Sequence, residues 1–346
     1  MNRTLAHRLG IDLPIIQAPM AGVQGSALAI AVSNAGGLGS LPGAMLDHDM
    51  LRQELAAVSA GTRQPFNVNF FCHAEPAPDA ARELAWRELF APYYHEFGID
   101  PMAITRGPSR RPFDDAVADV VELFRPPIVS FHFGLPSPQL LARVKSWGSF
   151  VLSTATTVDE ARWLEAHGAD AVIAQGLEAG GHRGHFLSQD ATLQSGTFAL
   201  VPRIVDAVRI PVIAAGGIAD RRGVAAAIAL GASAVQVGTA YLLCPEATTS
   251  PVHRAALMSD AASHTALTNV FSGGLARGIV NRVMREIGPV SALAPPFPLG
   301  GAPLAPLRVM AERAGSGDFS PLWAGQGALE RRQVGAAALT RDLMAE

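Results

Sequence analysis

A glycine-rich loop that contains a histidine is the stretch of this sequence best suited to chemistry. It directly follows residues 171–174, an apolar run typical of a strand buried on both faces. Glycine lets backbone N–H groups approach a flat or anionic ligand without a Cβ in the way. Parallel α/β folds place their chemistry at strand ends, so we expect His182 to be catalytic rather than a turn residue. The loop glycines are Gly180, Gly181 and Gly184.

Glycines also follow two later apolar runs. Gly216 and Gly217 come directly after residues 211–215. The next run, residues 234–238, ends in Gln236, Val237 and Gly238, and Thr239 follows it. Glycine N–H groups and helix N-termini after neighbouring strands are a frequent phosphate site in barrel enzymes, so the pair predicts a bound phosphate.

Other expected strand ends contribute amides, a hydroxyl and a second histidine to the same region. Few of these groups carry a charge, which suits a neutral heterocycle with carbonyl and N–H edges better than a sugar phosphate or a metal. A flavin mononucleotide (FMN) fits, with its phosphate at the two glycine sites and its ring across the mouth of the barrel. The residues concerned are Gln17, Met20, Gly22, Asn67, Asn69, Ser130, His132, Thr154 and Gln175.

The elements that must position these residues alternate between short apolar runs and helical patterns. Eight such runs indicate an α/β fold, a (β/α)8 TIM barrel over residues 1–244. A helical insertion over residues 72–127 follows the third strand, and we expect it to act as a lid or pocket wall. A mostly helical C-terminal segment, residues 245–346, is expected to pack back on the barrel. The expected strands are 14–20, 37–41, 66–71, 128–133, 150–155, 171–175, 211–215 and 234–238.

Composition excludes several classes of protein. A chain of 346 residues with 49% hydrophobic residues can bury a large core, and a net charge of -3 gives no case for binding nucleic acid or an anionic membrane. Cys72 and Cys244 lack metal-ligand spacing, which favours a reduced, cytoplasmic protein. The uncharged run 224–244 is expected to form a buried helix and strand, and the start of the chain lacks a signal peptide's apolar core. A homodimer is left open.

Two other kinds of barrel enzyme fit the residues poorly. A Schiff-base aldolase needs a lysine at a strand end, and Lys145 lies in an expected helix that faces away from the mouth. A metallohydrolase needs converging histidine and carboxylate ligands, which the first and eighth strands do not offer. We therefore expect no metal.

The whole chain resembles the class I nitronate monooxygenases. The motifs that carry the resemblance are QAPMAG (17–22), AGGLGSL (35–41), NVNFF (67–71), SFHFG (130–134), GLEAGGHRG (176–184), AAGGIAD (214–220), QVGTAYLLCPEA (236–247) and LWAGQG (322–327). By this resemblance the flavin contacts would be Asn69, Gln175, Gly180, Gly217 and residues 236–239, with Met20, Ala21 and Gly22 near the ring. His182 would be the active-site histidine, and Trp323, Gly325 and Gln326 would fold back over the flavin.

The resemblance implies oxidation of alkyl nitronates, such as propionate 3-nitronate, by O2, with release of nitrite and a carbonyl compound. Detoxification would be its purpose. In our hypothesis His182 and His132 hydrogen-bond the nitronate, and one electron passes to FMN to give a semiquinone. His132 could equally be a satisfied interior residue. An FMN-dependent NAD(P)H reductase acting on quinones or enoyl thioesters is the alternative, although a GxGxxG motif is absent. A non-catalytic FMN-binding barrel is the second alternative.

Overall fold

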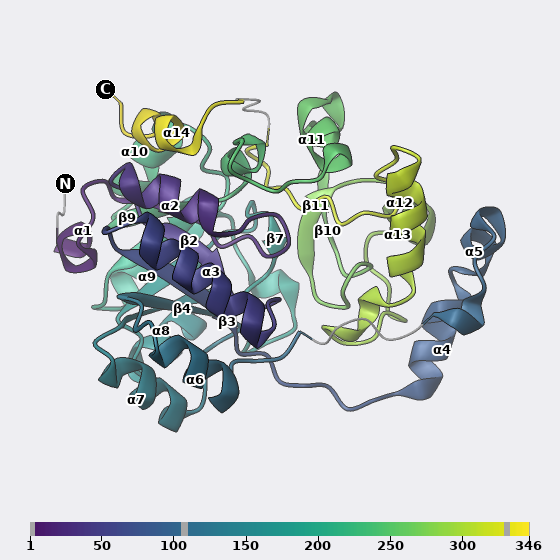
Figure 1. Cartoon of the computed structure of the whole chain (residues 1–346), viewed down its shortest axis with the longest axis horizontal. Coiled ribbons are helices and arrows are strands. Elements are labelled where there is room, and N and C mark those ends of the chain that lie inside the picture. Colours follow the sequence, from purple (N-terminus) through teal and green to yellow (C-terminus); the bar gives the residue numbers. More distant parts are fainter. Residues whose placement is uncertain (1–3, 105–109, 329–332, 346) are drawn as a thin grey trace.

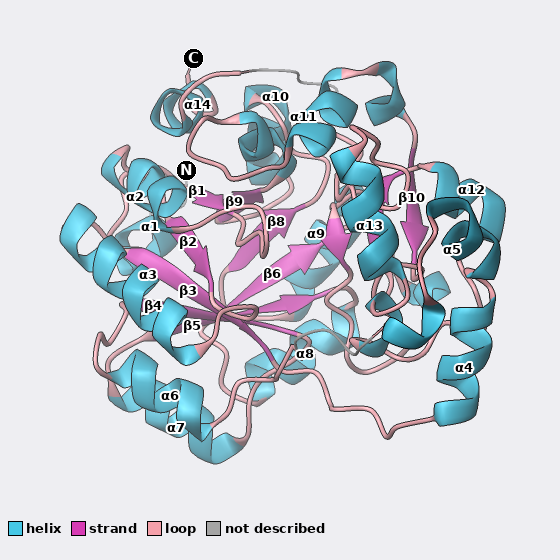
Figure 2. Ribbon diagram, turned by 45° about the vertical axis from the view of Figure 1, so that its right-hand side comes forward, coloured by secondary structure: helices cyan, strands magenta, loops and turns pink. Residues whose placement is uncertain are grey.

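The fold is a (β/α)8 TIM barrel, as the sequence predicts. The computed structural model describes residues 4–104, 110–328 and 333–345, and within these ranges no helix is long and apolar enough to cross a bilayer. The barrel strands converge in Figure 2. They are β1 (Ile15–Gln17), β2 (Gly39–Pro42), β3 (Phe66–Phe71), β4 (Ile128–His132), β5 (Phe150–Ala155), β6 (Ala171–Gln175), β8 (Val212–Ala215) and β9 (Ala234–Val237).

All neighbouring barrel strands are parallel, in the order β1-β9-β8-β6-β5-β4-β3-β2. The two ends of this order meet through a parallel bridge between Ile16 and Leu38. Gln17 N–H also donates to the Leu38 carbonyl at 2.9 Å, so the sheet closes on itself. Closure brings the carboxyl ends of all the strands to one mouth, where the expected site residues can meet.

Helices cover the outside of the barrel because each carries one apolar face. The N-terminal α1 (Thr4–Leu9) precedes them, and α14 (Ala336–Asp342) packs against α2 from the other end of the chain. Asp220 caps the N-terminus of α10, since its carboxylate accepts the N–H groups of Arg222 and Gly223. The remaining barrel helices are α2 (Ser26–Asn34), α3 (His48–Gly61), α6 (Asp115–Glu122), α7 (Pro138–Ser146), α8 (Val158–Ala166), α9 (Thr197–Ala207) and α10 (Arg221–Ala229).

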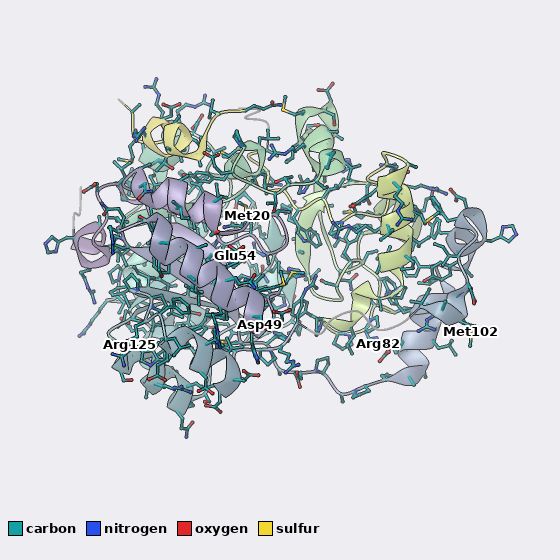
Figure 3. The ribbon with its side chains drawn as sticks, viewed as in Figure 1. Met20, Asp49, Glu54, Arg82, Met102 and Arg125 are labelled. Carbon is teal, nitrogen blue, oxygen red and sulfur yellow. The ribbon has the colours of Figure 1, made fainter. Side chains whose placement is uncertain are left out.

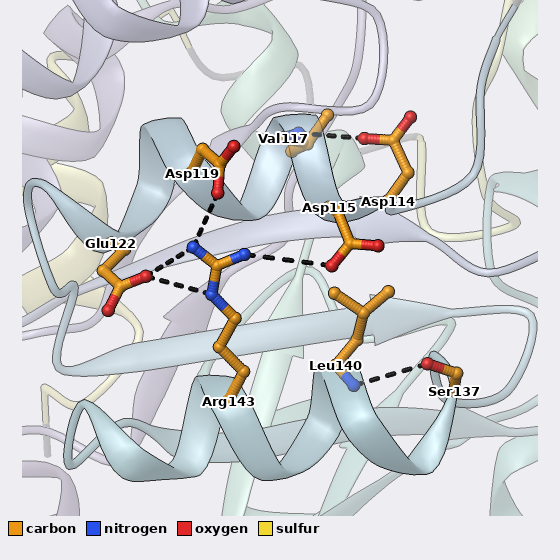
Figure 4. Close-up of polar contacts among 8 residues, drawn as sticks. All are labelled: Asp114, Asp115, Val117, Asp119, Glu122, Ser137, Leu140 and Arg143. Atoms are coloured by element: carbon orange, nitrogen blue, oxygen red, sulfur yellow. Dashed lines mark hydrogen bonds and ion pairs between the residues drawn. The ribbon is translucent and has the colours of Figure 1, made fainter.

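Helix α6 lies at the C-terminal end of the expected insertion and, together with α7 beyond it, belongs to the barrel wall. Arg143 on α7 reaches across to Asp119 at 2.7 Å and Glu122 at 2.5 Å on α6 (Figure 4). Asp114 caps α6 by accepting the N–H of Val117 at 2.9 Å. Capping and this shared arginine fix α6 as the helix that follows β3.

A second lobe, at the right of Figure 1, combines part of the insertion with the C-terminal segment. Residues 105–109 of the insertion lie outside the described residues. Its small antiparallel sheet has the order β10-β11-β7, which the expectation of a mostly helical segment missed. The elements of the lobe are α4 (Ala80–Glu88), α5 (Ala91–Phe97), β7 (Gly181–His182), α11 (Pro251–Met258), β10 (Thr265–Thr268), β11 (Ala276–Ile279), α12 (Arg282–Ile287) and α13 (Leu304–Arg313). Short 3-10 turns cover Pro101–Ala103, Ala191–Leu193, Thr239–Leu243, Asp260–Ser263 and Leu299–Gly301.

The lobe has an aromatic core of its own. Trp86 lies on α4, and Phe90 lies in the turn that follows this helix. Their rings pack together with centroids 4.9 Å apart, among apolar side chains of α12 and α13. Trp86 Nε1–H donates to the Gly300 carbonyl at 2.9 Å, and Tyr94 O–H to the Pro303 carbonyl at 2.9 Å. The α4–α5 segment therefore packs on the C-terminal segment. Figure 3 labels Arg82 and Met102 at this outer side and Met20 at the barrel side.

Replacing Trp86 by alanine should lower the free energy of unfolding by about 3–5 kcal/mol. The side chain is fully buried, and its loss leaves a cavity and an unpaired carbonyl. Leu84→Ala on the same helix is the control, because Leu84 is 56% exposed and its loss should stay within about 0.5 kcal/mol. Urea unfolding followed by circular dichroism measures both, and equal losses would contradict an aromatic core in this lobe.

Candidate functional site

One large cavity opens at the carboxyl ends of the barrel strands and is walled on its far side by the second lobe. Most of the strand-end residues expected from the sequence come together there, whereas Gln17, Asn67 and Ser130 are buried outside its lining. Among the expected site residues, those that line it are Met20, Ala21, Asn69, His132, Thr154, Gln175, Gly180, Gly181, His182, Gly216, Gly217, Gln236, Gly238, Thr239, Trp323 and Gly325. Val237 is buried in the hydrophobic core instead, and Gly22 and Gln326 lie outside the lining.

The glycines after β8 are required by the backbone. Gly216 and Gly217 have backbone φ angles of +117° and +71°, which residues with a side chain rarely adopt. A Cβ on Gly216 would lie 3.0 Å from the backbone nitrogen of Ala179. The backbone N–H groups of both glycines donate to no described residue, so they are free for an anionic ligand.

The C-terminal LWAGQG motif is tied to this cradle. Gly325 N–H donates to Thr239 Oγ1 at 2.9 Å, and Gln326 N–H donates to the Glu178 carbonyl at 2.9 Å. A Cβ on Gly180 would lie 2.5 Å from the Gly325 nitrogen, so the two glycine segments touch backbone to backbone. Gln326 thus fixes the wall of the cavity through its backbone.

His182 ends the loop on the short strand β7, which pairs with β11. Its Nε2 is 2.8 Å from Ser272 Oγ, and its ring packs against Phe297 and Trp323 at centroid distances of 5.0 and 5.4 Å. Burial, followed by the positive charge of Arg110, holds the pKa of His182 well below 6.5. The imidazole is therefore neutral at pH 7. Ser272 has no local sequence signal, since it lies ninety residues further along the chain.

His132 lines the cavity, but both of its ring nitrogens have partners. Nε2 is 3.1 Å from the His182 carbonyl, and Nδ1 is 3.1 Å from Thr154 Oγ1. A carbonyl oxygen only accepts, so Nε2 carries the proton and the neutral Nδ1 accepts from the hydroxyl of Thr154. Burial lowers the pKa of His132 to about 4, which keeps this tautomer. The geometry gives His132 a positioning role toward His182.

Gln175 supports the same loop from β6. Its Nε2 donates to the His182 carbonyl at 3.0 Å, and its Oε1 accepts the Gly184 N–H at 2.8 Å. Two side chains from barrel strands on either side of β5, His132 on β4 and Gln175 on β6, therefore converge on one backbone oxygen. The position of His182 over the cavity is set by the barrel wall beneath it.

A buried arginine that the sequence analysis did not single out anchors the start of the loop. Arg183 is fully buried, and its guanidinium donates to the carbonyls of Gln175 and Gly176 at 2.7 Å each and to Gln194 Oε1 at 2.8 Å. Burial lowers its pKa to about 10, so it keeps its charge at neutral pH. Two of the three acceptors lie at the end of β6, and Gln194 follows the 3-10 turn Ala191–Leu193.

Other cavity residues also escaped the sequence analysis. Arg110 lines the cavity from the connection between α5 and α6, and His253 donates from Nε2 to the Trp323 carbonyl at 3.0 Å. Among the described residues, no group of three or more histidine, cysteine, aspartate or glutamate side chains could hold a metal ion. The site is built from amides, glycine backbone, neutral histidines and one cation.

The chain is similar to known proteins along its whole length. Residues 2–346 match the family model described as nitronate monooxygenase. The chain is 44% identical over 348 residues to the nitronate monooxygenase of Pseudomonas aeruginosa, which covers 100% of this chain and 99% of that protein. The structure of this chain is similar to that of nitroalkane oxidase from Streptomyces ansochromogenes. The TM-score is 0.89 at 39% identity, over 98% of this chain and 96% of that one. FabK from Thermotoga maritima has a TM-score of 0.70 at 28% identity, over 98% of this chain and 94% of that one.

The low pKa of His132 predicts how stability depends on pH. The unfolded chain binds the proton near pH 6.5 and the folded protein only near pH 4, so stability is lost as the pH falls between these values. The loss is at most about 1.4 kcal/mol per pH unit. His132→Asn should flatten this slope, while His48→Asn, at an exposed position, should not. Urea unfolding at several pH values measures it, and an unchanged slope in His132→Asn would refute the neutral, buried imidazole.

Proposed function

Because this chain belongs to the nitronate monooxygenase family, we propose that it oxidises alkyl nitronates such as propionate 3-nitronate with FMN and O2. Nitrite and a carbonyl compound are the products. The observation that carries the proposal is one cavity lined both by a glycine cradle for a phosphate and by the neutral His182. The cytoplasmic location and the homodimer stay predictions from the sequence.

The residues of the cavity fit FMN. The Gln236 Oε1 atom is buried and has no hydrogen-bond partner among the described residues, so it waits for an N–H donor such as a flavin edge provides. The free N–H groups of Gly216 and Gly217 suit the phosphate. Met20, Ala21 and Asn69 line the rest of the space. When bound, FMN supplies an acceptor that takes up and returns single electrons.

His182 is the residue that meets the substrate. Among the described residues, its Nδ1 has no hydrogen-bond partner, while Ser272 occupies Nε2. If the hydroxyl of Ser272 donates to Nε2, Nδ1–H can donate to a nitronate oxygen. If Nε2–H donates to Ser272, Nδ1 can accept a proton from the carbon of a neutral nitroalkane. One imidazole and one hydroxyl therefore serve both substrate forms.

The test is anaerobic stopped-flow spectroscopy of the FMN-loaded protein, mixed separately with propionate 3-nitronate and with NADH or NADPH. We expect the nitronate to change the flavin spectrum and both nucleotides to leave it unchanged. Bleaching by a nucleotide, with the nitronate inert, would instead make the protein an NAD(P)H-dependent reductase.

His182→Asn should lower nitronate turnover by about 10²–10⁴-fold while the protein keeps its flavin. Asparagine retains a donor but loses the imidazole that orients the anion and exchanges a proton. His264→Asn, at an exposed position, is the matched control and should keep full turnover. Turnover is followed as nitrite release, and near-normal release by His182→Asn would remove His182 from the reaction.

Gly217→Leu should yield protein without FMN. The side chain would enter the phosphate cradle from a position with φ of +71° and 3.3 Å from Glu178 Cβ. Gly148→Leu is the control, because Gly148 has φ of +86° but no atom within 4 Å of an added Cβ. Both variants carry the same kind of backbone strain, so only filling of the cradle separates them. The ratio of flavin to protein absorbance is the measurement, and a yellow Gly217→Leu would place the phosphate elsewhere.

A further inference from the structure

One cation in the cavity has no counter-charge. Arg110 lines the cavity, and its guanidinium carbon lies 5.7 Å from the centroid of the Phe297 ring. The ring of His182 packs on that same phenyl group at 5.0 Å. No carboxylate of a described residue forms an ion pair with Arg110, although the surface arginines Arg143 and Arg282 each have acidic partners.

A second polar group beside Arg110 is also unsatisfied. His73 is only 9% exposed, and neither of its ring nitrogens makes a hydrogen bond with a described residue. Its ring packs against Phe297 at 4.8 Å and Phe133 at 6.0 Å, among the same aromatic side chains that surround His182. Burial lowers the pKa of His73, and the neighbouring backbone of Arg110 partly offsets this.

Leaving such groups without partners is costly. A buried polar group that makes no hydrogen bond costs free energy, and a desolvated charge costs more. Burial lowers the pKa of Arg110, and the nearby charge of Arg308 adds to this. These costs are recovered when a ligand brings an anion to the same place.

The position of this pair separates it from the phosphate cradle. His73 follows β3 and Arg110 precedes α6, whereas the cradle follows β8 and β9. His73 and Arg110 therefore both lie in the chain between β3 and β4. In the barrel order, β3 and β4 are separated from β8 and β9 by β5 and β6 on one side and by β1 and β2 on the other. The pair and the cradle are therefore on opposite sides of the mouth, with His182 facing the cavity from β7.

We propose that Arg110 and His73 form a carboxylate-binding subsite that selects nitronates bearing a carboxylate on the end remote from the nitronate group. A planar guanidinium matches the two oxygens of a carboxylate, and His73 supplies one further N–H donor. Contact of Arg110 and His182 with the same phenyl ring places the two ends of such a substrate a short carbon chain apart. The proposal rests on the proposed function, because His182 is taken to hold the nitronate end.

Binding can be tested without turnover. Calorimetry of the FMN-loaded enzyme, without oxygen, compares 3-nitropropionate with 1-nitropropane, which has the nitro group but no carboxylate. We expect Arg110→Gln to weaken the binding of 3-nitropropionate by at least about tenfold, or ~1.4 kcal/mol, and to leave the binding of 1-nitropropane unchanged. Arg110→Lys, which keeps the charge, should retain part of the affinity, and so guards against a folding defect in Arg110→Gln.

Arg111→Gln is the matched control, because it removes the same charge from the next, exposed position. It should bind both compounds as the unaltered protein does. His73→Phe should weaken the binding of 3-nitropropionate but not that of 1-nitropropane. His73→Asn, which keeps an N–H donor, should weaken the binding of 3-nitropropionate less. Unchanged affinity for 3-nitropropionate in Arg110→Gln would overturn the proposal, as would equal losses in Arg110→Gln and Arg111→Gln.

Kinetics distinguish a carboxylate subsite from a nitronate site. In Arg110→Gln, kcat/KM should fall at least about tenfold for propionate 3-nitronate and stay within about twofold for propyl-1-nitronate. An equal fall in kcat/KM for both nitronates would mean that Arg110 binds the nitronate group itself, which overturns the proposal. If the unaltered protein oxidises neither compound, the proposed function fails, and the calorimetric difference still decides whether Arg110 binds a carboxylate.

Discussion

The buried guanidinium of Arg183 is the interaction on which the rest of the site depends. It donates hydrogen bonds to the carbonyls of Gln175 and Gly176, where strand β6 turns sharply into the glycine loop. It also donates to the side-chain oxygen of Gln194. Breaking these contacts would leave buried polar groups without their charged donor, which costs free energy, so the guanidinium holds this turn rigid. Because the turn is rigid, the loop glycines on one side and His182 on the other keep fixed places at the mouth of the barrel.

Two structural units build the cavity, and each supplies a different kind of chemistry. The barrel contributes uncharged donors and glycine backbone, which suit a phosphate and a flat ring. The lobe contributes Trp323 and the connection that carries Arg110 to the lining, and Phe297 packs against both Arg110 and His182. Pairing of β7 with β11 joins the two units at His182 itself, so its imidazole lies on their boundary. A change in the packing of the lobe is therefore transmitted directly to the imidazole.

Local patterns predicted what depends on neighbours in sequence. Strands β3, β5 and β6 have the predicted bounds, because each is a largely apolar run between turn residues. The strands β10 and β11 were missed, since each has four residues and forms only by pairing with the other across the lobe. Ser272, Arg110 and His73 were missed for the same reason. Their importance comes from contacts with His182 and Phe297 that no local pattern records.

The charge of the cavity follows from desolvation. Four histidines lie at or beside the cavity, His73, His132, His182 and His253, and burial is the largest cause lowering the pKa of each, so none carries a proton at neutral pH. Protonating His73 or His182 would also bring a second positive charge close to Arg110. The cavity therefore holds its positive charge at one guanidinium and leaves the imidazoles to donate and accept single hydrogen bonds. In the proposed function, attraction of the anionic substrate is thus assigned to Arg110 and exchange of a proton to His182, so the anion can bind without protonating the imidazole.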